Sequence, residues 1–313
     1  MRDYQKLLTS VYMRADKQTA IVEREMAGVY RSAYDELTSS LGSLYTKMGD
    51  TPSIQEARRY NRLSLLKDEI RKAYKQLARV DIKYTEANGA GAFANLAYGT
   101  QWAIDQATGI ELKWNIIPVS AIRASVFNDV NGESYQDRFI NWSIKDQMKM
   151  NTQIGIGLTL GEPYAKVARR IKDVVQASYG EAIRIVRTEN TRNQSLGHLA
   201  TYDIAEELGV EMKKKWVATL DERTRASHGH LDGTYADKDG LFWIDGDSAE
   251  APGMFGVPEH DINCRCRVSE EIEGLEPELR RTRDEGVIDY VTFDTWAEAR
   301  GYKDGKWPIE KKI

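Results

Sequence analysis

The sequence has few of the residues that mark secreted, disulfide-bonded or membrane-spanning proteins. Of its 313 residues, two are cysteine and four are histidine. The cysteines, Cys264 and Cys266, are separated by one residue, which disfavours an unstrained disulfide between them. No window approaches the roughly 18 apolar residues needed to span a bilayer, and the first residues lack the apolar core of a signal peptide. These absences predict a chain that stays in the reducing cytoplasm and does not insert into membranes.

The charges are distributed unevenly along the chain. Residues 1–200 hold 28 Lys and Arg against 22 Asp and Glu, a net charge of +6, whereas residues 201–313 hold 16 against 26, a net charge of −10. A dedicated DNA-binding protein would concentrate basic residues on one face and have a high isoelectric point. The whole chain has a net charge of −4, so it does not fit that class. Most of its charges are expected on solvated helix faces.

Helix-forming residues dominate the first part of the chain, where Pro52 is the only proline before residue 80. Long helices are predicted from residue 4 to about 80, with turns at Gly42 and at 49–53 and with Ser53 as an N-cap. Further helices are predicted over 92–108, 136–152, 164–175 and 180–208. Breaks between helices are expected at 88–92 and 155–157. An extended link or short strand is predicted over 110–118, and a strand over 213–219. Pro163 is expected in the first turn of its helix, and Gly209 is expected to end the last one.

These patterns predict an α+β fold that is predominantly α-helical. Long N-terminal helices would be followed by a compact α+β domain with short strands and irregular loops. We place the helical region at 1–155, the compact domain at 156–270 and an acidic C-terminal tail at 271–313. The sequence shows no internal repeat and no low-complexity tract.

Three of the four histidines and both cysteines fall between residues 228 and 266. In an extended segment residues i and i+2 share a face, so Cys264 and Cys266 could present two sulfurs to one point. Thiolates with imidazole form a ligand set typical of zinc. The candidate ligands are His228, Cys264 and Cys266, with His230, Asp232 or His260 as the fourth. The alternative is that the thiols pack as small apolar groups and the histidines cap turns.

A second group of polar residues could form a buried network that joins a helix to the following loops. Its members are Arg187, Glu189, Trp216, Asp221, Arg223, Arg225, Asn263 and Arg265. The competing interpretation is a metal-dependent hydrolase or transferase with Glu189 and Asp221 as acid and base groups. The sequence contains no nucleophile elbow, Walker loop or H-E-x-x-H motif to accompany such groups. No catalytic residue is therefore predicted.

The order of these residues resembles one known family. Arg187, Thr188 and Glu189 come first, then Trp216, Asp221, Arg223, Thr224, Arg225 and His228, then Leu231, Asp232 and Gly233, and finally Pro258, Asn263, Cys264, Arg265 and Cys266. This series is similar to the phage head morphogenesis domain of the Mu F-like minor head proteins. The resemblance covers about residues 155–270, and His230 and His260 match no position of the family.

The resemblance implies a virion protein of a tailed bacteriophage, bound inside the head near the portal vertex and acting in head assembly, with DNA packaging or ejection as a further option. The expected partners are the portal protein and the major capsid or scaffold protein, with non-specific contact to packaged DNA as a further option. Before assembly the protein would be in the host cytoplasm. The resemblance implies a structural protein, and no enzyme is expected. Zinc is the one candidate cofactor, on the basis of the Cys and His donor set described above.

Overall fold

The computed structural model describes residues 4–59, 61–127, 133–272, 279–282 and 286–301. The part of the predicted tail at 302–313 lies outside these residues. The helices are α1 (Tyr4–Met48), α2 (Ile54–Arg59), α3 (Arg62–Thr108), α4 (Val119–Phe127), α5 (Tyr135–Thr159), α6 (Tyr164–Glu207), α7 (Ala226–His230), α8 (Pro258–Asp261) and α9 (Phe293–Glu298). The strands are β1 (Met212–Val217), β2 (Phe242–Ile244), β3 (Asp247–Ala249), β4 (Arg267–Ile272), β5 (Leu279–Arg281) and β6 (Val287–Asp289).

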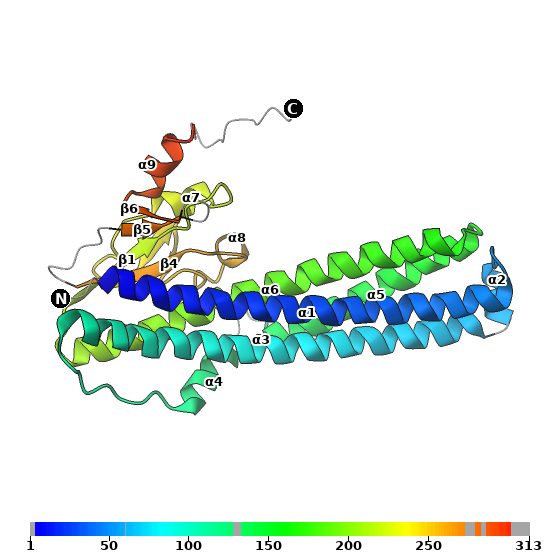
Figure 1. The fold of residues 1–313 in the computed structure, drawn as a ribbon, viewed down its shortest axis with the longest axis horizontal. Helices are drawn as coiled ribbons and strands as arrows, with labels where there is room; N and C mark the ends of the chain where they lie inside the picture. Colours follow the sequence, from blue (N-terminus) through cyan, green and yellow to red (C-terminus); the bar gives the residue numbers. More distant parts are fainter. Residues whose placement is uncertain (1–3, 60, 128–132, 273–278, 283–285, 302–313) are drawn as a thin grey trace. The chain divides into compact units, whose positions relative to one another are not determined.

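Long helices combined with short antiparallel strand pairs confirm the predicted α+β class (Figure 1). Two compact units make up the chain: the first holds residues 1–18, 88–131 and 187–313, and the second holds 19–87 and 132–186. These units combine distant parts of the sequence. The division at residues 155 and 270 therefore stays a prediction about folding units. Within the described residues, no helix is both long and apolar enough to cross a membrane.

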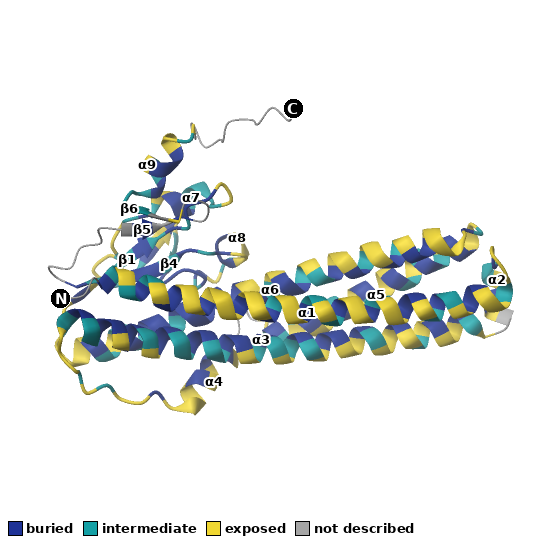
Figure 2. Cartoon of the chain, in the orientation of Figure 1, coloured by how far each residue is buried: buried dark blue, intermediate teal, exposed yellow. Residues whose placement is uncertain are grey.

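The second unit is built from helices whose apolar stripes face inward. One apolar stripe on α3 has members that recur every three or four residues, and all of them are buried: Leu63, Leu66, Ile70, Tyr74 and Leu77. Exposed residues follow the opposite sides of the long helices (Figure 2). Ser53 caps α2 as predicted, because its hydroxyl accepts a hydrogen bond from the amide of Glu56 at 3.2 Å. Apolar periodicity therefore predicts the faces of these helices correctly.

Two buried carboxylates interrupt the apolar interior of this unit. Tyr30 of α1 donates a hydrogen bond to Asp81 Oδ2 at 2.6 Å, and Ser178 of α6 donates one to Asp146 Oδ2 at 2.6 Å. Burial raises the pKa of Asp81 to about 7, and the bond from Tyr30 offsets only part of this shift. The interior of this unit thus holds a carboxyl group that titrates near neutrality.

Several glycines predicted to end helices lie inside them. Gly42 lies within α1, residues 88–92 lie within α3, and residues 155–157 lie within α5. The gap predicted between 175 and 180 is also helical, because α6 is continuous. Some of these glycines permit close packing. A Cβ on Gly157 would lie 2.5 Å from Val167 Cγ2, and one on Gly89 would lie 3.0 Å from Asn193 Nδ2. The tertiary contacts override the local preference of glycine for turns.

The first unit combines the start of α1, the later parts of α3 and α6, and all the strands. β1 pairs antiparallel with β4, from Met212 opposite Ile272 to Val217 opposite Arg267. Side chains of α1 bind the carbonyl groups of β4. Tyr12 donates a hydrogen bond to the carbonyl of Val268 at 2.5 Å, and Gln5 donates one to that of Glu270 at 3.0 Å. These bonds satisfy backbone carbonyls of β4 that could otherwise pair with a strand of another chain.

The C-terminal segment contributes to the core of the first unit. Phe293 and Trp296 of α9 are buried in the same cluster as Trp216 of β1 and Phe242 of β2. Arg280 of β5 is also buried. The described part of the segment predicted as an acidic tail is therefore packed against the domain that precedes it.

Candidate metal centre

Three predicted ligands meet in the interior of the first unit. His228 Nδ1 lies 3.6 Å from Cys264 Sγ and 3.5 Å from Cys266 Sγ. All three ligand atoms lie within 4.8 Å of one another, and the residues are 1%, 2% and 4% exposed. Two sulfurs and one imidazole nitrogen at this spacing are the donor set that zinc prefers. The residues present therefore fit a metal ion.

The local backbone explains why both sulfurs face the same point. Cys264 and Cys266 lie in the extended stretch that leads into β4, where alternate side chains share a face. Hydrogen bonds hold this stretch from the outside: Thr191 of α6 donates to the carbonyl of Cys264 and Thr219 donates to that of Arg265, each at 2.6 Å. Asn263 has a φ of 56°, a left-handed conformation that asparagine tolerates, and it begins the stretch.

The pKa values of the two thiols are shifted in opposite directions. A hydrogen bond from Cys266, together with the neighbouring His228 ring, lowers the pKa of Cys264 well below that of an ordinary thiol. Burial raises the pKa of Cys266. The lowered pKa of Cys264 favours the thiolate, the form in which cysteine binds a metal. A bound cation would stabilise both thiolates.

Aromatic rings enclose the histidine of the cluster. The ring centroid of His228 lies 5.7 Å from that of Trp216, 6.4 Å from that of Phe255 and 6.0 Å from that of His260. His260 lies on α8 and is 6% exposed. Its Nε2 lies 3.4 Å from Asp247 Oδ2, which sequence reasoning did not single out. An apolar shell of this kind excludes water from the ligands.

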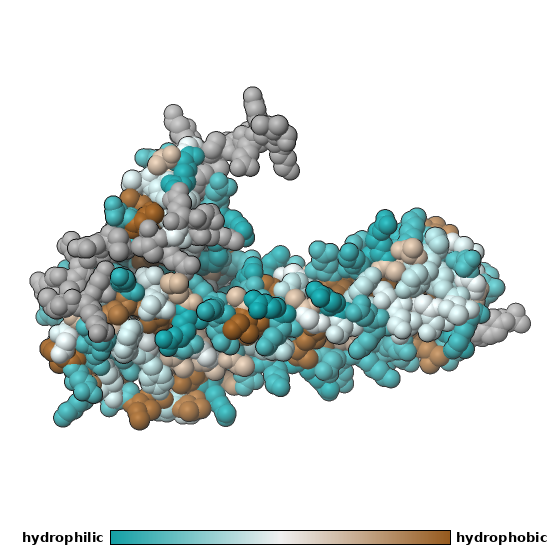
Figure 3. Space-filling view, in the orientation of Figure 1, coloured by the Kyte–Doolittle hydropathy of each residue, from teal (hydrophilic) through white to brown (hydrophobic). Residues whose placement is uncertain are grey.

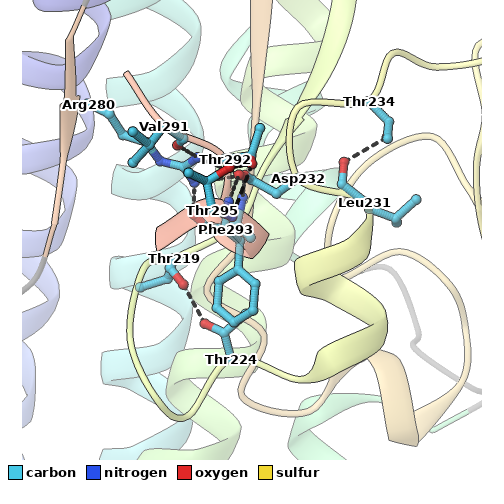
Figure 4. Close-up of polar contacts among 11 residues, drawn as sticks. Thr219, Thr224, Leu231, Asp232, Thr234, Arg280, Val291, Thr292, Phe293 and Thr295 are labelled. Carbon is cyan, nitrogen blue, oxygen red and sulfur yellow. Dashed lines mark hydrogen bonds and ion pairs between the residues drawn. The ribbon is translucent and has the colours of Figure 1, made fainter. Parts of the chain in front are cut away.

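The other two candidates for a fourth ligand have different partners. His230 is exposed, and its Nδ1 lies 3.4 Å from Asp294 Oδ2. Asp232 is buried and forms an ion pair with Arg280, and it also accepts hydrogen bonds from the amides of Ala218 at 2.7 Å and Phe293 at 2.6 Å (Figure 4). Asp232 is thus the centre of a polar junction that joins the C-terminal segment to β1. Arg280 was not foreseen, since it follows a stretch without a clear pattern.

The predicted polar network is divided among several local contacts. Glu189 is buried and forms an ion pair with Arg192 of the same helix at 2.9 Å. Arg192 also donates hydrogen bonds to two backbone carbonyls of α4. Asp221 accepts a two-pronged ion pair from Arg265. Arg225 donates to the carbonyl of Ile262 at 2.5 Å. The remaining members are placed as follows: Arg187 and Arg223 are exposed, Trp216 is buried, and the amide of Asn263 donates to Thr188 Oγ1 at 3.1 Å.

The buried polar residues of α6 extend further than the sequence indicated. Those from 188 to 195 are Thr188, Glu189, Asn190, Thr191, Arg192, Asn193, Gln194 and Ser195. Thr188, Thr191 and Ser195 bind the backbone of the loops at 252–264. The sequence signal for these contacts was a run of eight polar residues without an apolar stripe. Such a stretch of helix can be buried only if its polar side chains have hydrogen-bond or ion-pair partners.

The geometry of this centre lies within a stretch that matches a known family. Residues 148–269 match the family described as Phage Mu protein F like protein. The chain is also 28% identical to the minor head protein GP7 of Bacillus phage SPP1 over 289 residues, which cover 89% of this chain and 92% of that protein. Residues 148–269 therefore carry the domain of this family, and most of the chain is similar to a phage minor head protein. The resemblance in the sequence is therefore confirmed.

Two other relatives show that similar sequences occur in longer proteins. The chain is 33% identical over 297 residues to the NAD(+)--arginine ADP-ribosyltransferase EFV of Enterococcus faecalis, covering 94% of this chain and 59% of that protein. It is 27% identical over 202 residues to an uncharacterized protein of Haemophilus influenzae, covering 61% of this chain and 42% of that protein. The chain thus spans only part of both proteins. No solved structure matches it significantly.

Proposed function

We propose that this chain is a phage minor head protein that acts in head morphogenesis, bound inside the virion near the portal vertex. Its family membership over the stretch that carries the Cys and His cluster is the observation that supports this role. The expected partners are the portal protein and the major capsid or scaffold protein. The protein would reach the head from the host cytoplasm during assembly.

An exposed apolar row on α5 suits such a partner. Ile140, Ile144 and Met148 are 46%, 50% and 64% exposed and recur every four residues, so they lie along one side of the helix. On the face drawn in Figure 3, by comparison, hydrophobic side chains occur mostly in scattered small groups. A row of this kind is typical of helix-in-groove recognition.

A pull-down of the full chain with the portal protein of the same phage tests the partner. We expect binding by the parent chain and a loss of at least about tenfold in affinity for Ile144→Glu, because a charge would be buried in the contact. Ala165→Glu makes a similar change at an exposed position of α6 and should bind like the parent. If the parent chain does not bind, the portal as partner is wrong.

The Cys and His cluster would serve as a structural clasp that binds zinc. It joins α7 to the stretch before β4, and Thr191 attaches that stretch to α6. Bound zinc would hold these irregular loops together, so that the helices present fixed surfaces to partners. Truncation after Gly256 removes both cysteines and is expected to abolish the cooperative thermal transition of this unit. A cooperative transition in the truncated protein would contradict the clasp.

A structural role also agrees with the surroundings of the two candidate acid and base groups. Glu189 is paired with Arg192 and Asp221 with Arg265, so their charges are already balanced. The transferase named among the relatives extends well beyond the matched residues, so its activity cannot be assigned to this chain. Glu189→Gln separates the two roles. Failed incorporation into heads would favour structure, whereas normal heads with lost infectivity would favour catalysis.

Non-specific DNA binding is a second candidate, supported by a basic row on α3. Its members are all exposed and recur every four residues: Lys67, Arg71, Lys75, Arg79 and Lys83. At 1.5 Å and about 100° per residue the row rises about 24 Å and winds by about 160° around the helix, so neighbouring members such as Lys75 and Arg79 share a side that suits phosphate contacts. The nearby Asp68 pairs with Arg71 at 2.9 Å and weakens the row only locally.

The salt dependence of binding to random-sequence duplex DNA tests this second role. The logarithm of the affinity should fall linearly with the logarithm of salt concentration, and the double change K75E and R79E should reduce the slope by about 2. Lys238→Glu, at an exposed ion pair far along the sequence, serves as the control. Equal slopes for the two variants would contradict DNA binding through α3.

A further inference from the structure

The cluster supplies three protein ligands, whereas structural zinc usually takes four. Within the described residues, His228, Cys264 and Cys266 are the members found close enough together. A catalytic zinc ion keeps its fourth position open to water and substrate. Here all three residues are less than 5% exposed, so the site has the burial of a structural centre. A structural zinc at this point needs a fourth side chain nearby.

His260 is the imidazole next to this site. Its ring centroid lies 6.0 Å from that of His228, and both rings pack against Phe255. Two imidazoles bound to one tetrahedral zinc, with bonds of about 2.0 Å, have ring centroids about 5 Å apart. The observed separation exceeds this value by about 1 Å. His260 lies outside the group whose ligand atoms are all within 4.8 Å of one another, so binding zinc would require α8 to move toward the cluster.

Asp247 places a carboxylate at ion-pair distance from His260, and metal-binding histidines usually have a carboxylate partner beside them. A carboxylate that accepts the N–H of one ring nitrogen fixes the tautomer and leaves the other nitrogen free for the metal. His260 Nε2 lies 3.4 Å from Asp247 Oδ2, so Nδ1 is the nitrogen left for a ligand role. The same nitrogen of His228 faces the two sulfurs.

The loop before His260 is itself held in place. Asp261 accepts hydrogen bonds from the amides of Phe255 at 3.0 Å and Gly256 at 2.8 Å, which fixes the turn that leads into α8. Arg225 also donates to the carbonyl of His260 at 3.5 Å. These hydrogen bonds fix the loop that carries the imidazole of His260 beside the cluster.

We propose that His260 is the fourth zinc ligand and that Asp247 is its positioning residue. The inference rests on the proposal that the cluster binds zinc. It gives the centre two sulfur and two nitrogen ligands, and it assigns a role to a histidine that matched no position of the family. Zinc would then join α7, α8 and the stretch before β4 at one point.

The test measures zinc content, zinc affinity by competition with a chelator, and zinc K-edge X-ray absorption on the full chain. The parent should bind one zinc per chain with two imidazoles in the absorption fit. His260→Ala should keep one imidazole and lose more than about 100-fold in affinity, and Asp247→Asn should lose about 10- to 100-fold while keeping both imidazoles. His230→Ala, at the exposed histidine paired with Asp294, should match the parent.

The outcomes separate the two proposals. A parent chain purified without zinc, which takes up none when it is supplied, would overturn the zinc site itself. If the parent binds zinc but His260→Ala retains the affinity and the two-imidazole fit, the fourth-ligand assignment is wrong and the zinc site stands. Should His260→Ala fail to fold, His260→Cys provides the test, because it should restore zinc binding with three sulfurs and one nitrogen. A two-sulfur fit in that variant would also overturn the assignment.

Discussion

The buried carboxyl group of Asp81 should make stability fall as pH rises. Its pKa is raised from 3.8 to about 7, chiefly by burial, with Tyr30 as its hydrogen-bond donor. Between these two values the folded chain holds a proton that the unfolded chain has released. The free energy of unfolding therefore decreases from about pH 4 to about pH 7 and is flat above that range. At 1.36 kcal/mol per unit, the total is about 4 kcal/mol.

Asp81→Asn removes this titration while it keeps an oxygen that can accept the bond from Tyr30. We expect the variant to gain stability relative to the parent by about 4 kcal/mol between pH 4 and pH 8, because only the parent must ionise a buried group. Urea unfolding of both proteins across this range measures the difference. Any constant cost of burying the amide cancels when the two ends of the range are compared.

Asp68→Asn is the matched control, because Asp68 lies on the same helix and its side chain is 47% exposed beside Arg71. Its difference from the parent should change by less than about 1 kcal/mol over the same range. A difference between Asp81→Asn and the parent that stays constant with pH would refute the reasoning. It would mean that the carboxyl of Asp81 ionises as readily in the folded chain as in the unfolded one.

The remaining predictions concern stability in both units. Gly197→Ala should lower the free energy of unfolding by about 1–3 kcal/mol, because the new Cβ would lie 2.3 Å from the carbonyl oxygen of Phe93. Gly180→Ala on the same helix has nothing within 4 Å and should raise it by about 0.5–1 kcal/mol. Urea unfolding of these two variants gives opposite signs if the helix packs as described. Arg280→Ala should cost about 3–5 kcal/mol, because it leaves the buried charge of Asp232 unpaired. Equal thermal midpoints for this variant and the parent would argue against the junction.

The sequence predicts the elements that depend on local signals. The capping by Ser53, the start of α6 after Pro163 and its end at Gly209 follow from backbone preferences that do not need the rest of the fold. The strand predicted at 213–219 corresponds to β1. The predicted positions of Cys264 and Cys266 on one face likewise follow from the period of extended chain.

Other features depend on contacts between distant residues and could not be read from local patterns. Gly157 looks like a helix breaker, but it lies inside α5, where Val167 leaves no room for a Cβ. Arg280 follows a stretch without clear periodicity, and only its partner Asp232 explains its burial. Asp247 became a candidate because the fold brings it to His260. Such pairings arise from tertiary structure, which sequence spacing does not encode.

The most direct test of the proposed role is quantitative mass spectrometry of purified phage heads. Heads assembled with the portal protein should contain this chain in a few copies, and heads assembled without the portal should lack it. Heads that contain the chain in equal amounts with and without the portal would contradict its placement at the portal vertex. Complete absence from infectious particles would contradict its role as a head protein.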